Sequence, residues 1–246
     1  MSDIEEFAQE RAASIENLSR DGDLRRRATD FVRDVGKRRY VYNFDWLGLP
    51  IIQFPQDIVA IQELIWRIKP RAIVETGVAR GGSLALSASI LQLLGNDGVV
   101  VGVELELRPH NRKAISDHPL SSRIRIVDGS STSPETFARV QTIVADRQPV
   151  LVFLDANHTH DHVLAELRQY SKLVAKDSYI VVFDTIVDEL PAGYFADRPW
   201  GPGNNPKTAV QAFLAENDRF VVDQTIDGKL LVTSNPGGYL KCVKNP

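Results

Sequence analysis

Two aspartates follow strongly apolar segments of the sequence, at points where buried strands are expected to end. Asp155 closes the segment PVLVFLD, and Asp184 closes the segment YIVVFD. Because neighbouring strands of a doubly wound sheet bring their tips together, we expect the two carboxylates to converge. Paired carboxylates at such an edge suit a hard divalent cation that keeps several waters, such as magnesium. A pair of capping or hydrogen-bonded aspartates without an ion is the alternative interpretation.

Three of the five histidines come directly after Asp155, at positions 158, 160 and 162. His158 and His162 are four residues apart and would share one face of a helix. A bare H-x-x-x-H is nevertheless a weak metal signal, and the glutamate that zincins require does not follow the first histidine. Histidines at the start of a helix are more often part of a polar surface, so we do not predict a histidine pair as metal ligands.

A second group of polar residues surrounds a glycine turn. In the segment AIVETGVARGGS, residues 72–83, an apolar run leads through Glu75 and Gly77 to Gly81 and Ser83, and an apolar helical pattern follows. The pattern predicts a buried strand, a turn and the start of a helix. Glycine lets the backbone approach a ligand closely, and the free N–H groups of a helix start attract a polar group.

Two classes of cofactor use such a turn, and the spacing of the glycines separates them. Dinucleotides place a pyrophosphate on a G-x-G-x-x-G sequence. The sequence E-T-G-x-x-x-G-G-S instead has one glycine, a gap before the next pair, and an acid two residues ahead. This form favours S-adenosylmethionine, with Glu75 near the methionine ammonium. A glycine-rich turn that binds no ligand is the alternative.

Further candidate cofactor ligands follow the next two predicted strands. The strand VVVGVELE ends in Glu104 and Glu106. An acid at this position holds the ribose hydroxyls of the cofactor in Rossmann-like folds, and Glu104 is the better candidate because Glu106 lies further into the loop. A solvated loop acid is the alternative. The strand RIRIVD ends at Asp128, and we expect Asp128 and Ser130 to lie where an adenine edge would be read.

The elements that position these side chains alternate between strands and helices. Five apolar strands are separated by segments with helical periodicity, and two further strands, RFVVDQTI and KLLVTSN, flank Asp227-Gly228, which is a strong hairpin signal. We therefore predict an α/β fold with a Rossmann-like class I methyltransferase sheet. That sheet is mostly parallel and ends in an antiparallel C-terminal hairpin.

The N-terminal part of the sequence has a different character. Residues 3–35 are highly charged with scattered apolar positions, which is typical of surface helices. We expect a helical extension that covers the core, with a lid or a subunit contact as the alternative. Residues 40–58 are rich in aromatics and contain two prolines, so they predict an extended arm. We divide the chain into this extension and arm, residues 1–55, and a cofactor-binding domain, residues 56–246.

Composition limits the partners. The net charge of -3 gives no reason to expect nucleic acid or an anionic membrane as a partner. The single cysteine, Cys242, excludes an intramolecular disulfide. The charged start lacks the apolar core of a signal peptide, and no segment has the length of a membrane span, so we expect a cytoplasmic protein. The aromatic arm and the charged helices favour a homo-oligomer.

With these residues in view, the chain resembles the cephalosporin hydroxylase family, which is related to the sugar O-methyltransferases of macrolide biosynthesis. The matching segments are YNFDWLGLPIIQFPQDI, VETGVARGGSL, LDANHTHDHVLAEL, SYIVVFDT and SNPGGYLKCV. The resemblance implies an enzyme that depends on S-adenosylmethionine and has a magnesium site. It implies that Asp155 is a metal ligand and that the cofactor contacts Glu75, Gly77, Gly81, Ser83 and Glu104.

The chain departs from this family at one position. The family usually has Glu-Asp-Thr after the fifth strand, with both acids as metal ligands, whereas this chain has Phe183-Asp184-Thr185. One carboxylate is therefore missing. The site either holds magnesium weakly, uses a water or His158 in place of the carboxylate, or holds no metal.

The leading hypothesis is methyl transfer from S-adenosylmethionine to a hydroxyl of a small glycosylated or other natural-product acceptor. Most of the catalysis of such an in-line displacement comes from holding the acceptor oxygen, the methyl carbon and the sulfur in line. A metal on Asp155 and Asp184 would lower the pKa of the hydroxyl, and Asp155 or His158 would accept the proton. Two alternatives stay open: a component of cephalosporin-type hydroxylation or methoxylation, and a cofactor-binding relative without catalysis.

Overall fold

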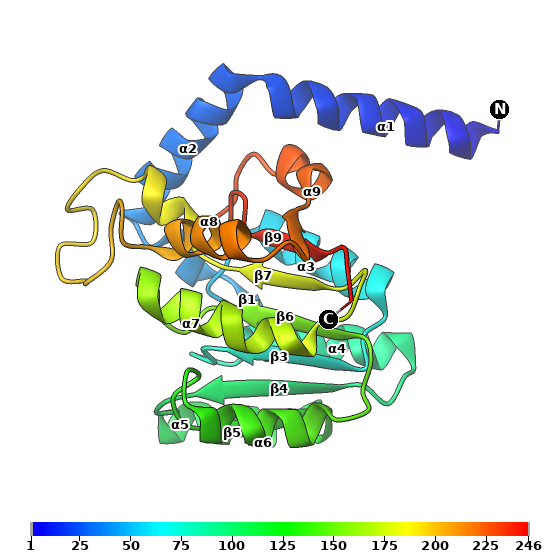
Figure 1. Ribbon diagram of the computed structural model, residues 1–246, viewed down its shortest axis with the longest axis vertical. Helices are drawn as coiled ribbons and strands as arrows, with labels where there is room; N and C mark the ends of the chain where they lie inside the picture. The colour runs from blue at the N-terminus through cyan, green and yellow to red at the C-terminus, as the bar shows by residue number, and fades with distance from the viewer. Residues whose placement is uncertain (1, 246) are drawn as a thin grey trace.

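The computed structural model of the protein describes residues 2–245 and has a layered α/β architecture (Figure 1). Its strands are β1 (Asp45–Trp46), β2 (Leu49–Pro50), β3 (Ala72–Thr76), β4 (Val99–Glu104), β5 (Ile124–Asp128), β6 (Val150–Leu154), β7 (Tyr179–Val182), β8 (Phe220–Val222) and β9 (Tyr239–Cys242). Its α-helices are α1 (Asp3–Arg20), α2 (Gly22–Gly36), α3 (Pro55–Ile68), α4 (Gly82–Leu94), α5 (Pro109–Asp117), α6 (Pro134–Val144), α7 (His160–Tyr170), α8 (Pro206–Glu216) and α9 (Gln224–Lys229). Short 3-10 helices are η1 (Tyr40–Asn43), η2 (Ser121–Arg123), η3 (Ser171–Leu173) and η4 (Thr185–Glu189).

The large sheet has the strand order β5-β4-β3-β6-β7-β9-β8. Strands β3 to β7 run parallel, β9 is antiparallel to β7, and β8 is antiparallel to β9. The predicted mostly parallel sheet with an antiparallel C-terminal pair is thus confirmed. The strand order reverses between β3 and β6, and open α/β sheets bind ligands at the carboxyl ends of the strands beside such a reversal.

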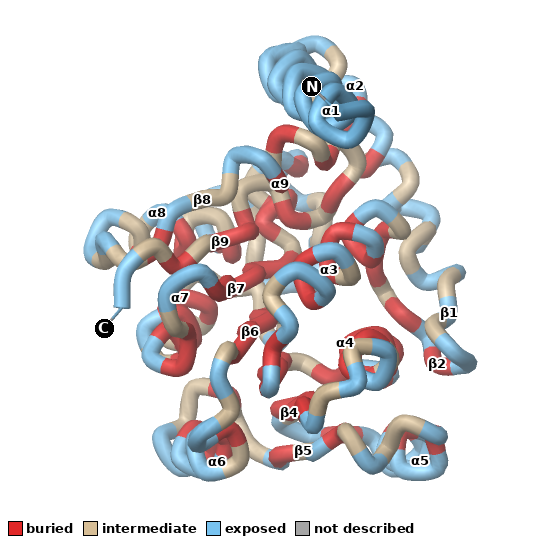
Figure 2. Tube along the Cα trace, turned by 90° about the vertical axis from the view of Figure 1, so that its right-hand side faces the viewer, coloured by how far each residue is buried: buried red, intermediate tan, exposed pale blue. Residues whose placement is uncertain are grey.

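Helices cover both faces of this sheet. Because side chains alternate along a strand, Ile73 of β3 packs into the core shared with α3 and α4, whereas Val74 packs into the core shared with α6, α7 and α8. Figure 2 shows these helices on opposite sides of the sheet, with the buried segments at the centre. Strands covered on both faces are apolar throughout, and this is why their sequence signal is strong.

The predicted hairpin turn at Asp227-Gly228 is wrong. Residues 224–229 form α9, residues 230–235 contain no strand, and β8 pairs with the later strand β9. Asp223 caps α9 by accepting hydrogen bonds from two backbone N–H groups, and Ile226 is buried in the core. A side chain at Gly228 would meet α1. The glycine therefore allows α9 and α1 to pack closely, and it does not form a turn between two strands.

The two N-terminal helices differ in burial. None of the residues Asp3–Arg20 of α1 is buried, whereas α2 buries Ala28 and Val32. The expectation that the extension covers the core is therefore wrong for α1, which runs along the outside of the molecule beside α9 (Figure 1). Across residues 2–245, no helix combines the length and the apolar character that crossing a membrane requires.

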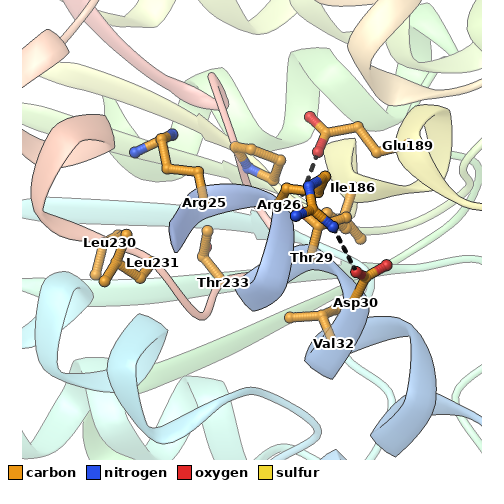
Figure 3. Close-up of a pocket in the computed structure, with 11 residues that line it drawn as sticks. Arg25, Arg26, Thr29, Asp30, Val32, Ile186, Glu189, Leu230, Leu231 and Thr233 are labelled. Carbon is orange, nitrogen blue, oxygen red and sulfur yellow. Dashed lines mark hydrogen bonds and ion pairs between the residues drawn. The ribbon is translucent and has the colours of Figure 1, made fainter. Parts of the chain in front are cut away.

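Helix α2 and the core enclose a cavity of about 420 Å³ (Figure 3). On the side of α2, Thr29 Oγ1 donates to Glu189 of η4 (3.3 Å), and Arg26 pairs with Asp30 (3.8 Å). Part of the opposite wall comes from the segment that follows α9, including Thr233. The cavity is therefore lined in part by η4, the 3-10 helix that follows β7.

The aromatic arm packs against the start of α4. It consists of η1 and the antiparallel ribbon β1–β2, and it ends earlier than predicted, because α3 begins at Pro55 and takes in residues 55–58. Trp46 Nε1 donates to Ser89 of α4 (3.1 Å), and Ile51 is buried. The carbonyl of Pro50 lies so close to Gly82 that a side chain there would collide with it. The arm therefore lies over the glycine turn.

Candidate active site

The two aspartates predicted to converge do lie together at the carboxyl edge of the sheet. Asp155 follows β6 and Asp184 follows β7, which are neighbouring parallel strands with Leu154 opposite Val182. Each of Asp155, Asp184 and His158 offers a donor atom within 4.8 Å of the other two. Within residues 2–245 this is the one cluster of three such side chains with metal-ligand spacing.

The electrostatics of this cluster favour a positive charge. Burial, and next the nearby carboxylate of Asp184, raise the pKa of Asp155 well above its usual range. His158 Nε2 lies 3.3 Å from Asp184 Oδ2. Two carboxylates this close repel each other unless a proton or a cation lies between them. Two carboxylate oxygens and an imidazole nitrogen are suitable donors for a divalent metal.

An edge-on aromatic contact orients His158. The rings of His158 and Trp200 lie 4.8 Å apart at 88°. Trp200 belongs to the long loop before α8, and Asp188 anchors that loop by accepting hydrogen bonds from Gly203 N (3.1 Å) and Asn205 Nδ2 (2.6 Å). No pattern in the sequence indicates that Trp200 contacts this histidine.

The other two histidines face different partners. His162 Nε2 lies 3.0 Å from Ser131 Oγ and 3.4 Å from Glu166 Oε1, and His160 Nδ1 lies 2.8 Å from Thr208 Oγ1. His158 precedes α7, so it does not share a helical face with His162. The three histidines therefore contact three different groups of residues.

The glycine turn lies beside the aspartate cluster. Gly77 and Gly81 have φ values of 85° and 86°, which favour glycine. A side chain at Gly77 would also collide with the backbone carbonyl of Asp155. The turn is therefore packed against the residue that begins the loop after β6, and any ligand on the turn lies next to the carboxylate cluster.

Glu75 is a buried acid beneath this turn. It is 3 % exposed, and its Oε1 accepts a hydrogen bond from the Ser83 hydroxyl. Its Oε2 has no partner among the described residues. Burial raises the pKa of Glu75 to about 8, although the hydrogen bond from Ser83 lowers it. A buried carboxylate oxygen without a partner is costly and fits a cationic ligand group above it.

Glu104 holds the same turn from the neighbouring strand. Its Oε2 accepts hydrogen bonds from the backbone N–H groups of Val78 (2.9 Å) and Ala79 (3.2 Å). Asn111 braces the turn as well, because its Nδ2 donates to the Ala79 carbonyl (2.8 Å). No pattern in the sequence indicates Asn111, which lies on α5.

Asp128 and Ser130 end the adjacent strand. Asp128 lies opposite Glu104 in the register of β4 and β5, so the strand tips align as predicted. Its carboxylate is exposed and pairs with Arg112. Ser130 Oγ lies 3.0 Å from Thr132 Oγ1. Asp128 and Ser130 therefore both lie at the carboxyl edge of the sheet.

Sequence reasoning did not identify Gln53. This arm residue lines a small hollow together with Gly77, Gly81, Ser83 and Asp155. It is 6 % exposed, and its Oε1 has no partner among residues 2–245. Two buried acceptors without partners, Gln53 Oε1 and Glu75 Oε2, therefore lie around one glycine turn.

Comparison with known proteins places the chain in a family. The family model described as Rhamnosyl O-methyltransferase/CmcI matches residues 38–243. The chain belongs to this family. The rhamnosyl O-methyltransferases of Mycobacterium bovis and Mycobacterium tuberculosis are 28 % identical to it over 226 residues, which covers 87 % of this chain and 86 % of theirs. The resemblance predicted from the sequence motifs is thus confirmed.

Solved structures agree with this Rhamnosyl O-methyltransferase/CmcI membership at the level of the fold. A structure of CmcI-D160 with Mg and SAM is 20 % identical, covers 82 % of this chain and 77 % of its own, and has a TM-score of 0.57. Cofactor-bound Rv0187 from MTB is 18 % identical, covers 90 % of both chains, and has a TM-score of 0.52. The predicted Rossmann-like methyltransferase fold is therefore confirmed.

Phe183 occupies the position where this family was expected to have an acid. Its side chain is 4 % exposed and lies in the core, edge-on to Phe153 with ring centroids 6.1 Å apart. The chain thus contributes Asp155, Asp184 and His158 to the carboxyl edge, and Phe183 contributes apolar packing beneath it.

Proposed function

We propose that this protein transfers a methyl group from S-adenosylmethionine to a hydroxyl of a sugar or other natural-product acceptor, assisted by a magnesium ion at Asp155 and Asp184. One observation carries the proposal: the glycine turn at Gly77 packs against the backbone of Asp155. A methyl donor on the turn and an acceptor oxygen at the carboxylates would therefore be neighbours. The names of the curated relatives support the same reaction and suggest a rhamnosyl acceptor.

The residues around the turn fit the cofactor. The buried Glu75 Oε2 would accept from the ammonium of the methionine part, and Gln53 is a second acceptor nearby. The N-terminus of α4, with Gly81 and Ser83, offers backbone N–H groups to a carboxylate. Glu104 would accept from the ribose hydroxyls, with Asp128 and Ser130 at the adenine edge.

When bound, the cofactor supplies an electrophilic methyl group, and the metal supplies positive charge beside the acceptor oxygen. Asp155 and Asp184 would hold the metal, and His158 would accept the proton of the acceptor hydroxyl. The acceptor oxygen would gain a bond to the methyl carbon as the carbon–sulfur bond breaks, and the electron pair of that bond would stay on sulfur. Trp200 fixes the ring of His158. Two carboxylates beside a single histidine differ from the two-histidine triad of iron oxygenases.

Incubation with methyl-labelled S-adenosylmethionine and synthetic rhamnosides tests the proposed reaction. The proposal predicts label in the rhamnoside when magnesium is present, and a loss of at least about tenfold in rate after treatment with a chelator. Recovery on adding magnesium back separates metal removal from damage to the protein. If the label is transferred equally well with and without chelator, the metal has no role in the reaction.

The raised pKa of Glu75 predicts proton release on cofactor binding. With a pKa of about 8, the free carboxyl is mostly protonated at pH 7, and an ammonium group above it favours the ionised form. Cofactor affinity should therefore rise with pH between about 6 and 8. Calorimetry at pH 7 in buffers of different ionisation enthalpy measures the release, which approaches one proton per cofactor and disappears in Glu75→Gln. Equal heats in all buffers would contradict this role of Glu75.

We also propose that the protein forms a homo-oligomer. Ile4 and Phe7 of α1 are 80 % and 64 % exposed, and no residue of α1 is buried within the chain, so this helix presents apolar side chains that a second copy could cover. Light scattering after gel filtration should show a mass above that of one chain, and Phe7→Ser should lower it. A monomer at micromolar concentration would contradict the proposal.

A further inference from the structure

Residues 233–238, here called the clamp, lie beside the end of β7 and hold the residues that follow it. Three hydrogen bonds join the two segments: Asp184 N–H to Asn235 Oδ1 (3.0 Å), Thr185 Oγ1 to the Pro236 carbonyl (2.9 Å), and Ile186 N–H to the Ser234 carbonyl (3.0 Å). Asp184 has a φ of 55°. A residue other than glycine keeps this conformation only when its surroundings fix it. The clamp therefore determines where the Asp184 carboxylate lies.

A buried carboxylate on a different element fixes the clamp. Asp57 lies in the first turn of α3 and is 0 % exposed. Four donors surround it: Thr233 Oγ1, Ser234 N–H (2.9 Å), Ser234 Oγ (3.3 Å) and Tyr239 OH (3.2 Å). Three of these four donors belong to the clamp. A buried carboxylate is stable only when such donors satisfy it, so Asp57 and the clamp depend on each other.

The contacts continue from Asp57 to the aspartate cluster without a gap. The Ser234 hydroxyl lies within hydrogen-bond distance of both Asp57 Oδ2 (3.3 Å) and Asn235 Oδ1 (2.9 Å). Asn235 Oδ1 in turn accepts from the backbone N–H of Asp184. Asn235 is fully buried, so its amide has little freedom to find another position. Burial raises the pKa of Asp57 to about 6, so the carboxylate is ionised at pH 7.5.

We propose that Asp57 is a positioning residue for Asp184, and that it acts through the clamp to hold Asp184 in metal-binding geometry. The inference rests on the proposed metal site and extends it to α3, because Asp57 acts through Ser234 and Asn235. This role also explains the sequence SNPGG, residues 234–238, which takes no part in the proposed reaction. Gly238 belongs to this segment because a side chain there would collide with the Val182 carbonyl.

Titration of metal-free protein with Mn²⁺ at pH 7.5, followed by the electron paramagnetic resonance signal of free Mn²⁺, tests the proposal. Residues that orient metal ligands change metal affinity by about 10- to 100-fold when replaced, so Asp57→Asn should bind Mn²⁺ at least about tenfold more weakly than the wild type. Thr233→Val, which removes one donor to Asp57, should show a smaller loss. Thr233→Ser keeps the hydroxyl and should restore wild-type affinity.

Two controls separate positioning from general stability. Three of the proposed cofactor contacts, Glu75, Ser83 and Glu104, lie on β3, α4 and β4, and S-adenosylmethionine affinity should stay within about twofold of the wild type in all variants. Val144→Ala removes buried methyl groups from α6, and it should lower the melting temperature without changing the affinity for Mn²⁺.

The possible outcomes distinguish a failure of the role proposed for Asp57 from a failure of the proposed metal site. If the wild type binds Mn²⁺ and Asp57→Asn binds it equally well, Asp57 is only structural and the inference is overturned, while the proposed function stands. If Asp57→Asn does not fold, wild-type affinity in Thr233→Val overturns the inference in the same way. A wild-type protein that binds no Mn²⁺ overturns the metal site and, with it, the role given to Asp57.

Discussion

Replacing Asp155 by asparagine is expected to lower the rate of methyl transfer by about three orders of magnitude or more, which corresponds to about 4 kcal/mol of transition-state stabilisation. The substitution keeps the size of the side chain but removes one of the two carboxylates that converge with His158. The remaining carboxylate would hold a divalent cation only weakly, and the acceptor hydroxyl would lose the positive charge that lowers its pKa.

The raised pKa of Asp155 adds a dependence on pH to this expectation. Protons compete with the metal for a carboxylate whose pKa lies above the usual range, so magnesium affinity should fall as the pH is lowered. Isothermal titration calorimetry with magnesium measures the loss of metal affinity in Asp155→Asn and the dependence of that affinity on pH. The matched control is Asp177→Asn, at the opposite end of β7, where the carboxylate is exposed and lies 3.7 Å from Lys241. If Asp155→Asn transfers methyl groups at the wild-type rate, Asp155 takes no part in the mechanism.

Replacing His158 by glutamine is expected to lower kcat by about 10²- to 10⁴-fold, which is the usual contribution of a general base. Binding of the cofactor should change little, because His158 is not among the proposed cofactor contacts.

His160→Gln is the control for this variant. His160 lies two residues away and contacts Thr208 of α8 instead of the aspartates, so its replacement should leave kcat within about threefold of the wild type. If His158→Gln retains more than about a tenth of the wild-type kcat, a different group accepts the proton.

The carboxyl edge of the sheet was predictable because its strands are buried on both faces. Apolar runs ending in Asp155, Asp184 and Glu104 mark where each strand stops, and parallel pairing then brings the tips together. No long-range information was needed for this step. The same reasoning placed the glycine turn at Gly77 and Gly81 beside them.

Contacts between distant segments were not predictable in this way. Asn235 is 51 residues from Asp184, and nothing in its local sequence distinguishes it from a loop amide. The error at Asp227-Gly228 has the same origin, because packing of α9 against α1 and the core outweighed a local turn signal. Helix α1 had a pattern suited to covering the core, but its residues stay outside.

The most direct test of the account is calorimetric titration of metal-free protein with S-adenosylmethionine, repeated after addition of magnesium. The account predicts binding of one cofactor per chain, a loss of at least about tenfold in affinity in Glu104→Ala, and a separate magnesium heat that is absent in Asp155→Asn. If S-adenosylmethionine gives no heat of binding with or without magnesium, at several temperatures, the cofactor assignment and the proposed methyl transfer are both wrong.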